Sequence, residues 1–340
     1  MTGRTEGPDS GDTFDGMRPP GALALEFRAD SFDHPTGLVD AGTVISWIEK
    51  AGYAVAASWA GTFVRARYVG HTQFRHPVPV DRRAVVQARV VHTDGAEVHV
   101  QTRMLLPEIR DDDGDPVVAT SSLVVYAAEE GGVRVTVPVW EPSTPGQIER
   151  DEQARRSTVA RRAVERGMAR LPFPAPGEAP EEMSTLAFLA PNAEATVGGT
   201  INAGAILRWV DEAAAVCAAR WTGHESVVAV FGGGVRFVRN IHVGDLVRVE
   251  ALLVNTTERS MHVALRVYAS RRTGAESRLV AHSIAVMVDV SAEDQAQRVR
   301  QYVPESESAR RLQETAIELV RMRSEVSAAW TETRRSTYPR

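Results

Sequence analysis

Residues 203–223, AGAILRWVDEAAAVCAARWTG, repeat an earlier stretch of the chain, AGTVISWIEKAGYAVAASWAG at 41–61. Alanines, glycines and tryptophans coincide at a constant offset of 162 residues (203 − 41), and the acid is kept in type, with Glu49 matching Asp211. Two tryptophans, two glycines and an acid in step over about twenty positions indicate a tandem duplication rather than chance. The sequence therefore predicts one fold present twice.

The match continues downstream with one inserted residue, at an offset of 163 (237 − 74). In each copy an apolar helix of about five turns is predicted to stop at a glycine, Gly61 or Gly223. Alternating apolar and polar residues then predict antiparallel strands. These strands are expected at 84–93, 97–106 and 117–129 in the first copy, and at 246–255, 260–269 and 278–290 in the second. One long helix followed by such strands predicts an α+β fold in which the sheet wraps the helix.

The repeat divides the 340-residue chain into five parts. The polar, acidic N-terminus predicts a disordered tail with no secretory signal. The segment between the copies predicts a charged surface helix at 151–167 and a proline-rich linker. Helical spacing of apolar residues at 307–330 predicts a helix that packs on the core or on a neighbouring chain. The expected parts are a tail (1–21), a domain (22–129), a linker (130–184), a second domain (185–292) and a C-terminal segment (293–340).

Composition narrows the functional classes. A net charge of -5 gives no support for nucleic-acid binding, which usually needs a basic face. A single cysteine, Cys217, excludes an internal disulfide and fits a reducing compartment. No apolar run approaches the roughly 20 residues of a membrane span, so the cytoplasm is the expected location. No spacing of histidine, cysteine and aspartate predicts a metal site.

Asp211 lies at the boundary of its predicted helix. On a helical wheel it shares a stripe with small residues such as Gly204, Ala214 and Ala218, which leave room for a ligand. A carboxylate there loses hydration, and this raises its pKa unless hydrogen bonds compensate. A solvated boundary position is the alternative, and the matching acid in the first copy, Glu49, weighs against it.

A glycine-rich turn precedes the same helix. Helix N-termini present unpaired amides and the positive end of the helix dipole. The N–H groups of Asn202 to Gly204 are therefore expected to polarise a carbonyl and hold a developing oxyanion. Gly42 and Gly204 are expected to let the backbone approach a ligand closely. Since an acid two turns into the helix could activate water or attack the carbonyl, this arrangement favours acyl transfer to water.

The second copy strongly resembles the hotdog-fold acyl-CoA thioesterases over about a hundred residues. The resemblance rests on GGTINAGAILRWVDEAAAVCAARWTG, from residue 198, and on VRFVRNIHVGDLVRVEALLVNTTERSMHV, from residue 235. The first copy is a weaker match. The whole chain looks like a double-hotdog acyl-CoA hydrolase, in which the fused halves form the pseudo-dimer that separate chains form elsewhere.

The resemblance implies a catalytic site at the interface of the two halves. One half would give the helix acid, and the other a polar residue, usually asparagine, from the turn before its helix. Asp211 matches the acid, while the asparagine position holds His34 in the first copy and Thr196 in the second. The implied sites therefore pair Asp211 with His34, and Glu49 with Thr196, and the Asp211 site is favoured.

Substrate-binding residues follow from the same resemblance. Besides Gly42, the turn residue Asn202 and Ser260, in the family's T–SM segment, are expected to bind acyl-CoA. Coenzyme A phosphates need cations, and Arg236 and Arg239 near the strand starts are the candidates. No cofactor is expected beyond the coenzyme A of the substrate. A homo-oligomer is expected, and trimers are common among double-hotdog relatives.

Two other functions remain open. The segment FDHPTGLVDAG, from residue 32, places a histidine before a glycine turn and a helix glutamate, as in hotdog-fold dehydratases. The absence of the family's asparagine also fits a protein that binds acyl-CoA without catalytic activity.

Overall fold

The computed structural model shows the expected duplication. It describes residues 21–30, 37–70, 72–174, 182–196, 198–232, 234–274, 276–292 and 295–336, so His34 and most of the predicted N-terminal tail lie outside the described residues. In the first half, the long helix α1 (Ala41–Ala60) lies among seven strands. These are β1 (Ala22–Phe27), β2 (Val64–Val69), β3 (Thr72–Phe74), β4 (Ala84–Asp94), β5 (Glu97–Arg110), β6 (Pro116–Glu130) and β7 (Val133–Arg134).

The second half has the same order of elements. Helix α2 (Pro145–Ala169) connects the halves, and α4 (Glu307–Ser336) ends the described chain. Between them lie β8 (Met183–Leu189), the short 3-10 helix η1 (Asn192–Glu194), α3 (Ala203–Thr222), β9 (Val227–Gly232), β10 (Val235–Phe237), β11 (Leu246–Thr256), β12 (Met261–Ser270) and β13 (Arg278–Asp289). The expected antiparallel strands are confirmed, with ends that shift by a few residues at most. Seven strands that the alternation did not single out are additional, namely β1, β2, β3, β7, β8, β9 and β10.

The boundaries of the two central helices follow from their caps. Asp40 accepts from the Thr43 N–H at the start of α1, and Asn202 accepts from the Ala205 N–H at the start of α3. Both helices end at glycine, as predicted, since Gly61 and Gly223 have φ values of 69° and 78° in the left-handed region.

One antiparallel sheet runs through both halves in the order β1-β4-β5-β6-β2-β10-β13-β12-β11-β8. The halves join reciprocally. Strand β2 pairs with β10, and β3 pairs with β9, so each half contributes the same two strands to the seam. Because this strand pairing is reciprocal, the two halves are related by a pseudo-two-fold axis. The sheet therefore has the wrapped, tandem arrangement that the sequence predicted.

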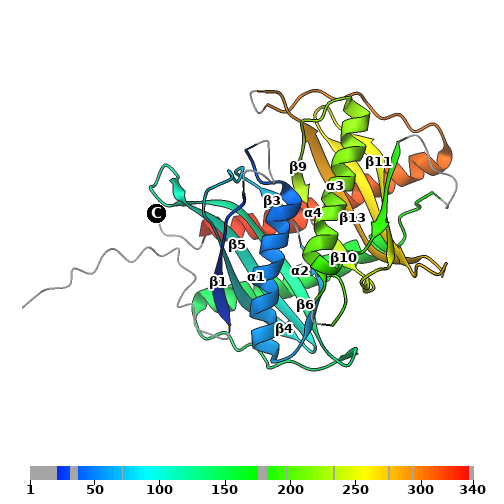
Figure 1. The fold of residues 1–340 in the computed structure, drawn as a ribbon. Helices are drawn as coiled ribbons and strands as arrows, with labels where there is room; N and C mark the ends of the chain where they lie inside the picture. Colours follow the sequence, from blue (N-terminus) through cyan, green and yellow to red (C-terminus); the bar gives the residue numbers. More distant parts are fainter. Residues whose placement is uncertain are drawn as a thin grey trace, which may run out of the picture.

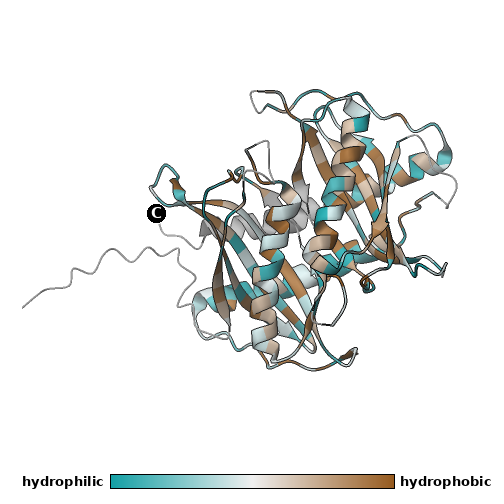
Figure 2. Ribbon diagram, in the orientation of Figure 1, coloured by the Kyte–Doolittle hydropathy of each residue, from teal (hydrophilic) through white to brown (hydrophobic). Residues whose placement is uncertain are grey.

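Helices cover both faces of the sheet. Figure 1 shows α1 and α3 side by side on one face, with α2 and α4 behind the other. The larger core lies under α1 and α3, around fully buried side chains such as Ile48 and Leu253. A smaller core joins α2 and α4 to the outer face through Met168, Ile284 and Leu319. Figure 2 shows hydrophobic residues concentrated along the strands, as sheets covered on both faces require.

The segments after the last strand of each domain also repeat. The Trp59 Nε1–H donates to Pro138 O at 2.9 Å, and the Trp221 Nε1–H donates to Arg300 O at 3.0 Å. These partners differ by the same offset of 162 residues (300 − 138). The repeat therefore continues beyond residue 129 into the segment that the sequence assigned to the linker.

Candidate active site

The two central helices touch through a glycine near the start of each. A Cβ added at Gly42 would lie 2.8 Å from the Arg208 Cα, and one added at Gly204 would lie 2.7 Å from the Ser46 Oγ. Since 204 − 42 and 208 − 46 both equal 162, the two contacts are equivalent by the repeat. Only glycine at these positions permits this separation of α1 and α3.

Each glycine amide holds the acid of the opposite helix. The Gly42 N–H donates to the Asp211 Oδ2 at 3.0 Å, and the Gly204 N–H donates to the Glu49 carboxylate. Both amides belong to the first turn of a helix, where the N–H groups have no partner within the helix and the dipole favours negative charge. The two acids of the repeat therefore bind across the domain interface in the same way.

Burial sets the proton affinity of both acids. Desolvation raises the pKa of Glu49 to about 7, against the opposing effects of Lys50 and of the Gly204 amide. Desolvation also raises the pKa of Asp211 to about 7, with further raising by Asp40 and Glu212 and lowering by the Gly42 amide. Both carboxyls therefore exchange protons near neutral pH, where a general base or acid is most effective.

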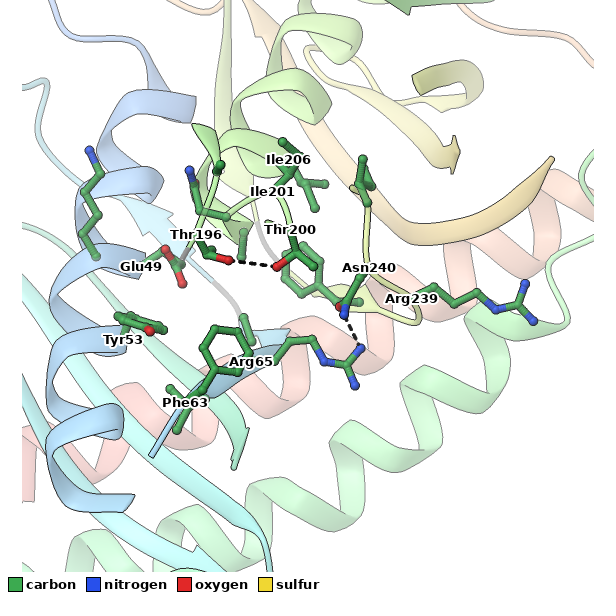
Figure 3. Close-up of a pocket in the computed structure, with 18 residues that line it drawn as sticks. Glu49, Tyr53, Phe63, Arg65, Thr196, Thr200, Ile201, Ile206, Arg239 and Asn240 are labelled. Atoms are coloured by element: carbon green, nitrogen blue, oxygen red, sulfur yellow. Dashed lines mark hydrogen bonds between the residues drawn. The ribbon is translucent and has the colours of Figure 1, made fainter. Parts of the chain in front are cut away.

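A cavity of about 320 Å³ lies beside Glu49, between the two halves. Figure 3 shows Glu49 and Tyr53 from α1 facing Thr196 and Ile201 from the other half. Aromatic and aliphatic side chains form much of its wall. Among them are Tyr53, Phe63, Ile206, Phe237 and Ile241. The cavity thus joins an apolar space to a carboxyl group, which suits an acyl chain that ends in a reactive carbonyl.

The wall opposite Glu49 is a tight turn. The Thr196 N–H donates to Thr200 O at 2.7 Å, and the two side-chain oxygens lie 2.9 Å apart (Figure 3). Glu194 fixes the end of this turn, because the Asn202 Nδ2–H donates to both its backbone and its carboxylate oxygens. Glu194 also pairs with Arg208. Thr196 therefore lies in the cavity wall with its backbone N–H and its hydroxyl both bonded to Thr200.

Arg65 makes hydrogen bonds to both halves at the edge of the cavity. Its Nε–H donates to the Glu129 Oε1 at 3.0 Å, and its Nη1–H donates to the Asn240 Oδ1 at 3.1 Å (Figure 3). Asn240 belongs to the second half, so this arginine fixes the cavity across the interface.

Comparison with known proteins supports the same architecture. The model of the thioesterase superfamily matches the chain twice, over residues 36–110 and 198–275. Each half of the chain therefore contains one region that is similar to thioesterase-superfamily domains. The human cytosolic acyl coenzyme A thioester hydrolase is 23% identical over 295 residues, which are 81% of this chain and 76% of that protein.

A solved structure that spans most of this chain shares the fold. A protein assigned as an oleoyl thioesterase from Lactobacillus plantarum superposes with a TM-score of 0.52 at 11% identity, over 79% of this chain and 97% of that one. An acyl-CoA hydrolase from Staphylococcus aureus, in complex with butyryl coenzyme A, coenzyme A and coenzyme A disulfide, gives a TM-score of 0.42 at 21% identity, over 46% of this chain and 94% of that one. The likeness to the Lactobacillus plantarum protein, together with the two matched regions, confirms the tandem hotdog fold predicted from the sequence.

The two halves bring several predicted residues to the cavity. Glu49, Thr196, Asn202 and Arg239 all line it. Asn202 caps α3 as well, so its side-chain oxygen is engaged by the Ala205 N–H. The loop expected to pair with Asp211, which contains His34, lies outside the described residues.

Other predicted residues lie outside the cavity wall. Gly42 and Gly204 were expected to admit a ligand, but each is packed against the opposite helix and its amide binds a carboxylate. Arg236 is not part of the cavity wall, and its Nε lies 3.7 Å from Glu165 on α2, so it takes part in an ion pair there. Ser260 closes the hairpin between β11 and β12, where its Oγ lies 2.7 Å from the Thr257 Oγ1.

Three functional features escaped the sequence analysis. Lys50 and Arg65 line the cavity, and the Tyr126 O–H donates to Glu49 O at 2.9 Å. Lys50 directly follows the predicted acid, so its place in the chain was an available signal. Arg65 and Tyr126 depend on how the strands pair, and no local pattern marks them.

Metal and membrane features were searched in the described ranges. There, no group of three or more histidine, cysteine, aspartate or glutamate side chains could hold a metal ion. Among those same residues, no helix has the length and apolarity needed to cross a membrane.

Proposed function

We propose that this protein hydrolyses an acyl-CoA thioester to a free acid and coenzyme A at the interface of its two domains. The observation that carries this proposal is the pair of interface carboxyls, each held by the opposite helix and each with a pKa of about 7. The apolar cavity beside one of them and the matches to thioesterases support the same reaction.

The chemistry needs only water beside the substrate. An ionised carboxylate accepts a proton from a water molecule as the water oxygen attacks the carbonyl carbon of the thioester. The carbon–sulfur bond then breaks, and the leaving thiolate of coenzyme A takes up a proton. Asp211 with His34, and Glu49 with Thr196, are the two places where this base could act. No cofactor is part of the proposal.

Location and assembly belong to the same proposal. The human relative is named cytosolic, which supports a cytoplasmic location here. Leu189 on the edge strand β8 and its partner Leu246 on β11 are both about half exposed, at 50% and 44%. An exposed apolar edge favours self-association, and a trimer is one form to test by light scattering on the full chain.

Release of free coenzyme A, detected with a thiol reagent over a series of acyl chain lengths, tests the reaction. We expect turnover by the wild-type protein and a loss of roughly 10²-fold or more in the Glu49→Gln/Asp211→Asn double variant, since both candidate bases are removed. Glu314→Gln, an exposed acid on α4, serves as the matched control.

Three outcomes would contradict the proposal. One is no release from any acyl length, and another is unchanged release by the double variant. The third is loss of the conjugated double bond of an enoyl-CoA in place of coenzyme A release, which would indicate hydration. Tight acyl-CoA binding without turnover would instead identify a binding protein.

A further inference from the structure

We infer that acyl-CoA is held and cleaved on the Glu49 side of the pseudo-two-fold axis, with Glu49 as the base and Arg239 as the residue that binds a phosphate of coenzyme A. This inference rests on the proposed thioester hydrolysis. The repeat creates two equivalent candidate sites. Catalysis is assigned here to the one that contains Glu49.

Charge is the first difference between the two sides. Glu49 is followed by Lys50, whereas the equivalent residue after Asp211 is Glu212 (50 + 162). The cap residue beside Glu49 is the neutral Asn202, whereas Asp40 holds that position beside Asp211. A polyanion such as coenzyme A is attracted to the first arrangement and repelled by the second.

The strands add one more difference of the same sign, at Arg239, and a second cation, Arg65, that Glu129 already neutralises. Strand β2 begins Val64-Arg65, whereas its counterpart β9 begins Val227-Val228. Arg239 lines the Glu49 cavity, and its equivalent by the offset of 163 is His76.

Two nearby charges do not change this contrast. The exposed Arg75, beside His76, corresponds to Val238, which is not part of the cavity wall. Glu194 lies near Lys50 but is already paired with Arg208. Both sides therefore share a backbone arrangement, while among the residues that the structure describes the cations that line a cavity are on the Glu49 side.

The layout of the cavity matches that of the substrate. In acyl-CoA the reacting thioester and the phosphates lie at opposite ends of the pantetheine arm. Figure 3 shows Glu49 and Arg239 on opposite sides of the cavity, with Arg65 and Asn240 between them. Arg239 is exposed and makes no ion pair with any residue that the structure describes, so its guanidinium is available to a phosphate.

Arg65 has a different task on this side. It is engaged by Glu129 and Asn240, so it fixes the wall of the cavity rather than offering a free charge. Thr196, held in its turn by Thr200, supplies a hydroxyl opposite Glu49.

The test compares two substrates of the same acyl group, acyl-CoA and the acyl-N-acetylcysteamine thioester, which has no phosphates. For Arg239→Ala we expect KM for acyl-CoA to rise roughly tenfold or more, because a charge-assisted contact is lost, and kcat/KM for the phosphate-free thioester to stay unchanged. Arg239→Lys restores part of the affinity. His76→Ala, at the equivalent position, leaves both substrates as in wild type.

The two acids are then compared directly. Glu49→Gln is expected to lose at least ten times more kcat than Asp211→Asn, with thermal unfolding checked for each variant. The inference is overturned if Asp211→Asn loses more turnover than Glu49→Gln, or if Arg239→Ala and His76→Ala raise KM equally.

Binding of coenzyme A itself, measured by titration calorimetry, separates this inference from the proposed reaction. If the wild-type protein releases no coenzyme A from any substrate, the proposed hydrolysis fails. The binding assignment still stands in that case if Arg239→Ala weakens coenzyme A binding roughly tenfold and His76→Ala does not. Equal binding by all three proteins overturns the assignment whatever the turnover.

Discussion

Glu49 and Asp211 occupy equivalent places in the two halves, and the difference between them lies in their surroundings rather than in their geometry. Each accepts an N–H from the glycine of the opposite helix, and each has a pKa near 7 through burial. The charges near the two acids shift their pKa values in opposite directions. Lys50 lowers the pKa of Glu49, while Asp40 and Glu212 raise that of Asp211.

Steric constraints explain why the glycine contact between α1 and α3 is the same in both halves. The charges around the two acids are under no such constraint and differ. The helix contact allows almost no change, because a side chain at Gly42 or Gly204 would meet the opposite helix. Exposed charges such as Lys50 and Glu212 meet no such barrier. In a fused pseudo-dimer each copy can change alone, so one interface can carry two sites of different character.

The helix contact gives the largest expected effect. In Gly42→Ala the new Cβ would meet the backbone of Arg208 at 2.8 Å, which no rotamer relieves. We expect the free energy of unfolding to fall by about 3 kcal/mol, measured by urea denaturation. In Gly204→Ala the new Cβ meets the Ser46 side chain, so we expect a smaller loss, about 2 kcal/mol.

A second substitution sharpens this contrast. Ser46→Gly added to Gly204→Ala removes the obstructing side chain and should recover much of the lost stability, whereas nothing equivalent can be removed for Gly42→Ala. Gly146→Ala, near the start of α2, is the control, because its Cβ would meet only the flexible end of Arg150. Equal losses in both variants, without recovery by Ser46→Gly, would refute the steric account.

Proton linkage gives the next effect. The pKa of each acid is raised on folding, for Glu49 from 4.5 to about 7 and for Asp211 from 3.8 to about 7. Between these values the folded protein holds a proton that the unfolded chain has released, so stability falls as pH rises from about 4 to 7. Glu49→Gln and Asp211→Asn should each remove part of this slope, which by pH 8 amounts to about 3 kcal/mol for Glu49 and about 4 kcal/mol for Asp211.

Salt should shift the titration midpoints of the two acids in opposite directions. Raising the NaCl concentration screens Lys50 and should move the Glu49 midpoint to higher pH. The same salt screens Asp40 and Glu212 and should move the Asp211 midpoint to lower pH. Carboxyl titration by NMR measures both midpoints, and shifts of the same sign would show that the two surroundings do not differ in charge.

The fold was predictable because its determinants are local and repeated. The structure confirms the helix ends at Gly61 and Gly223, the alternating strands and the constant offset between the halves. The raised pKa of Asp211 also followed from its small-residue stripe. Strand β1 lacked any comparable mark, since its place is set by pairing with β4.

The site was harder to predict because it forms between distant segments. Glycines in a turn before a helix fit both a ligand contact and a helix contact, and only the packing of α1 on α3 decides between them. Arg236 and Arg239 are three residues apart, yet only Arg239 lines the cavity, because the chain leaves β10 between them. The Arg65–Asn240 contact depends on strand pairing across the seam.

The smallest expected effect comes from a feature that the halves share. The Trp140 N–H donates to the Thr93 Oγ1 at 2.8 Å, and the Tyr302 N–H donates to the Thr256 Oγ1 at 2.7 Å. Both bonds hold a returning segment against the end of a strand. Thr93→Val and Thr256→Val should each cost about 1 kcal/mol, because the amide loses a partner while the side-chain volume stays the same.

Equal costs at these two threonines would extend the repeat to residues 140 and 302, and so to the segments that cover Trp59 and Trp221. Urea denaturation measures both variants, with Thr315→Val on α4 as a control whose hydroxyl bonds only within its own helix. The double variant should lose the sum of the two costs, since the sites lie in different domains and share no partner. A loss confined to one threonine would mean that only one half still depends on its returning segment, and the structural equivalence of the two halves would end at the last strand.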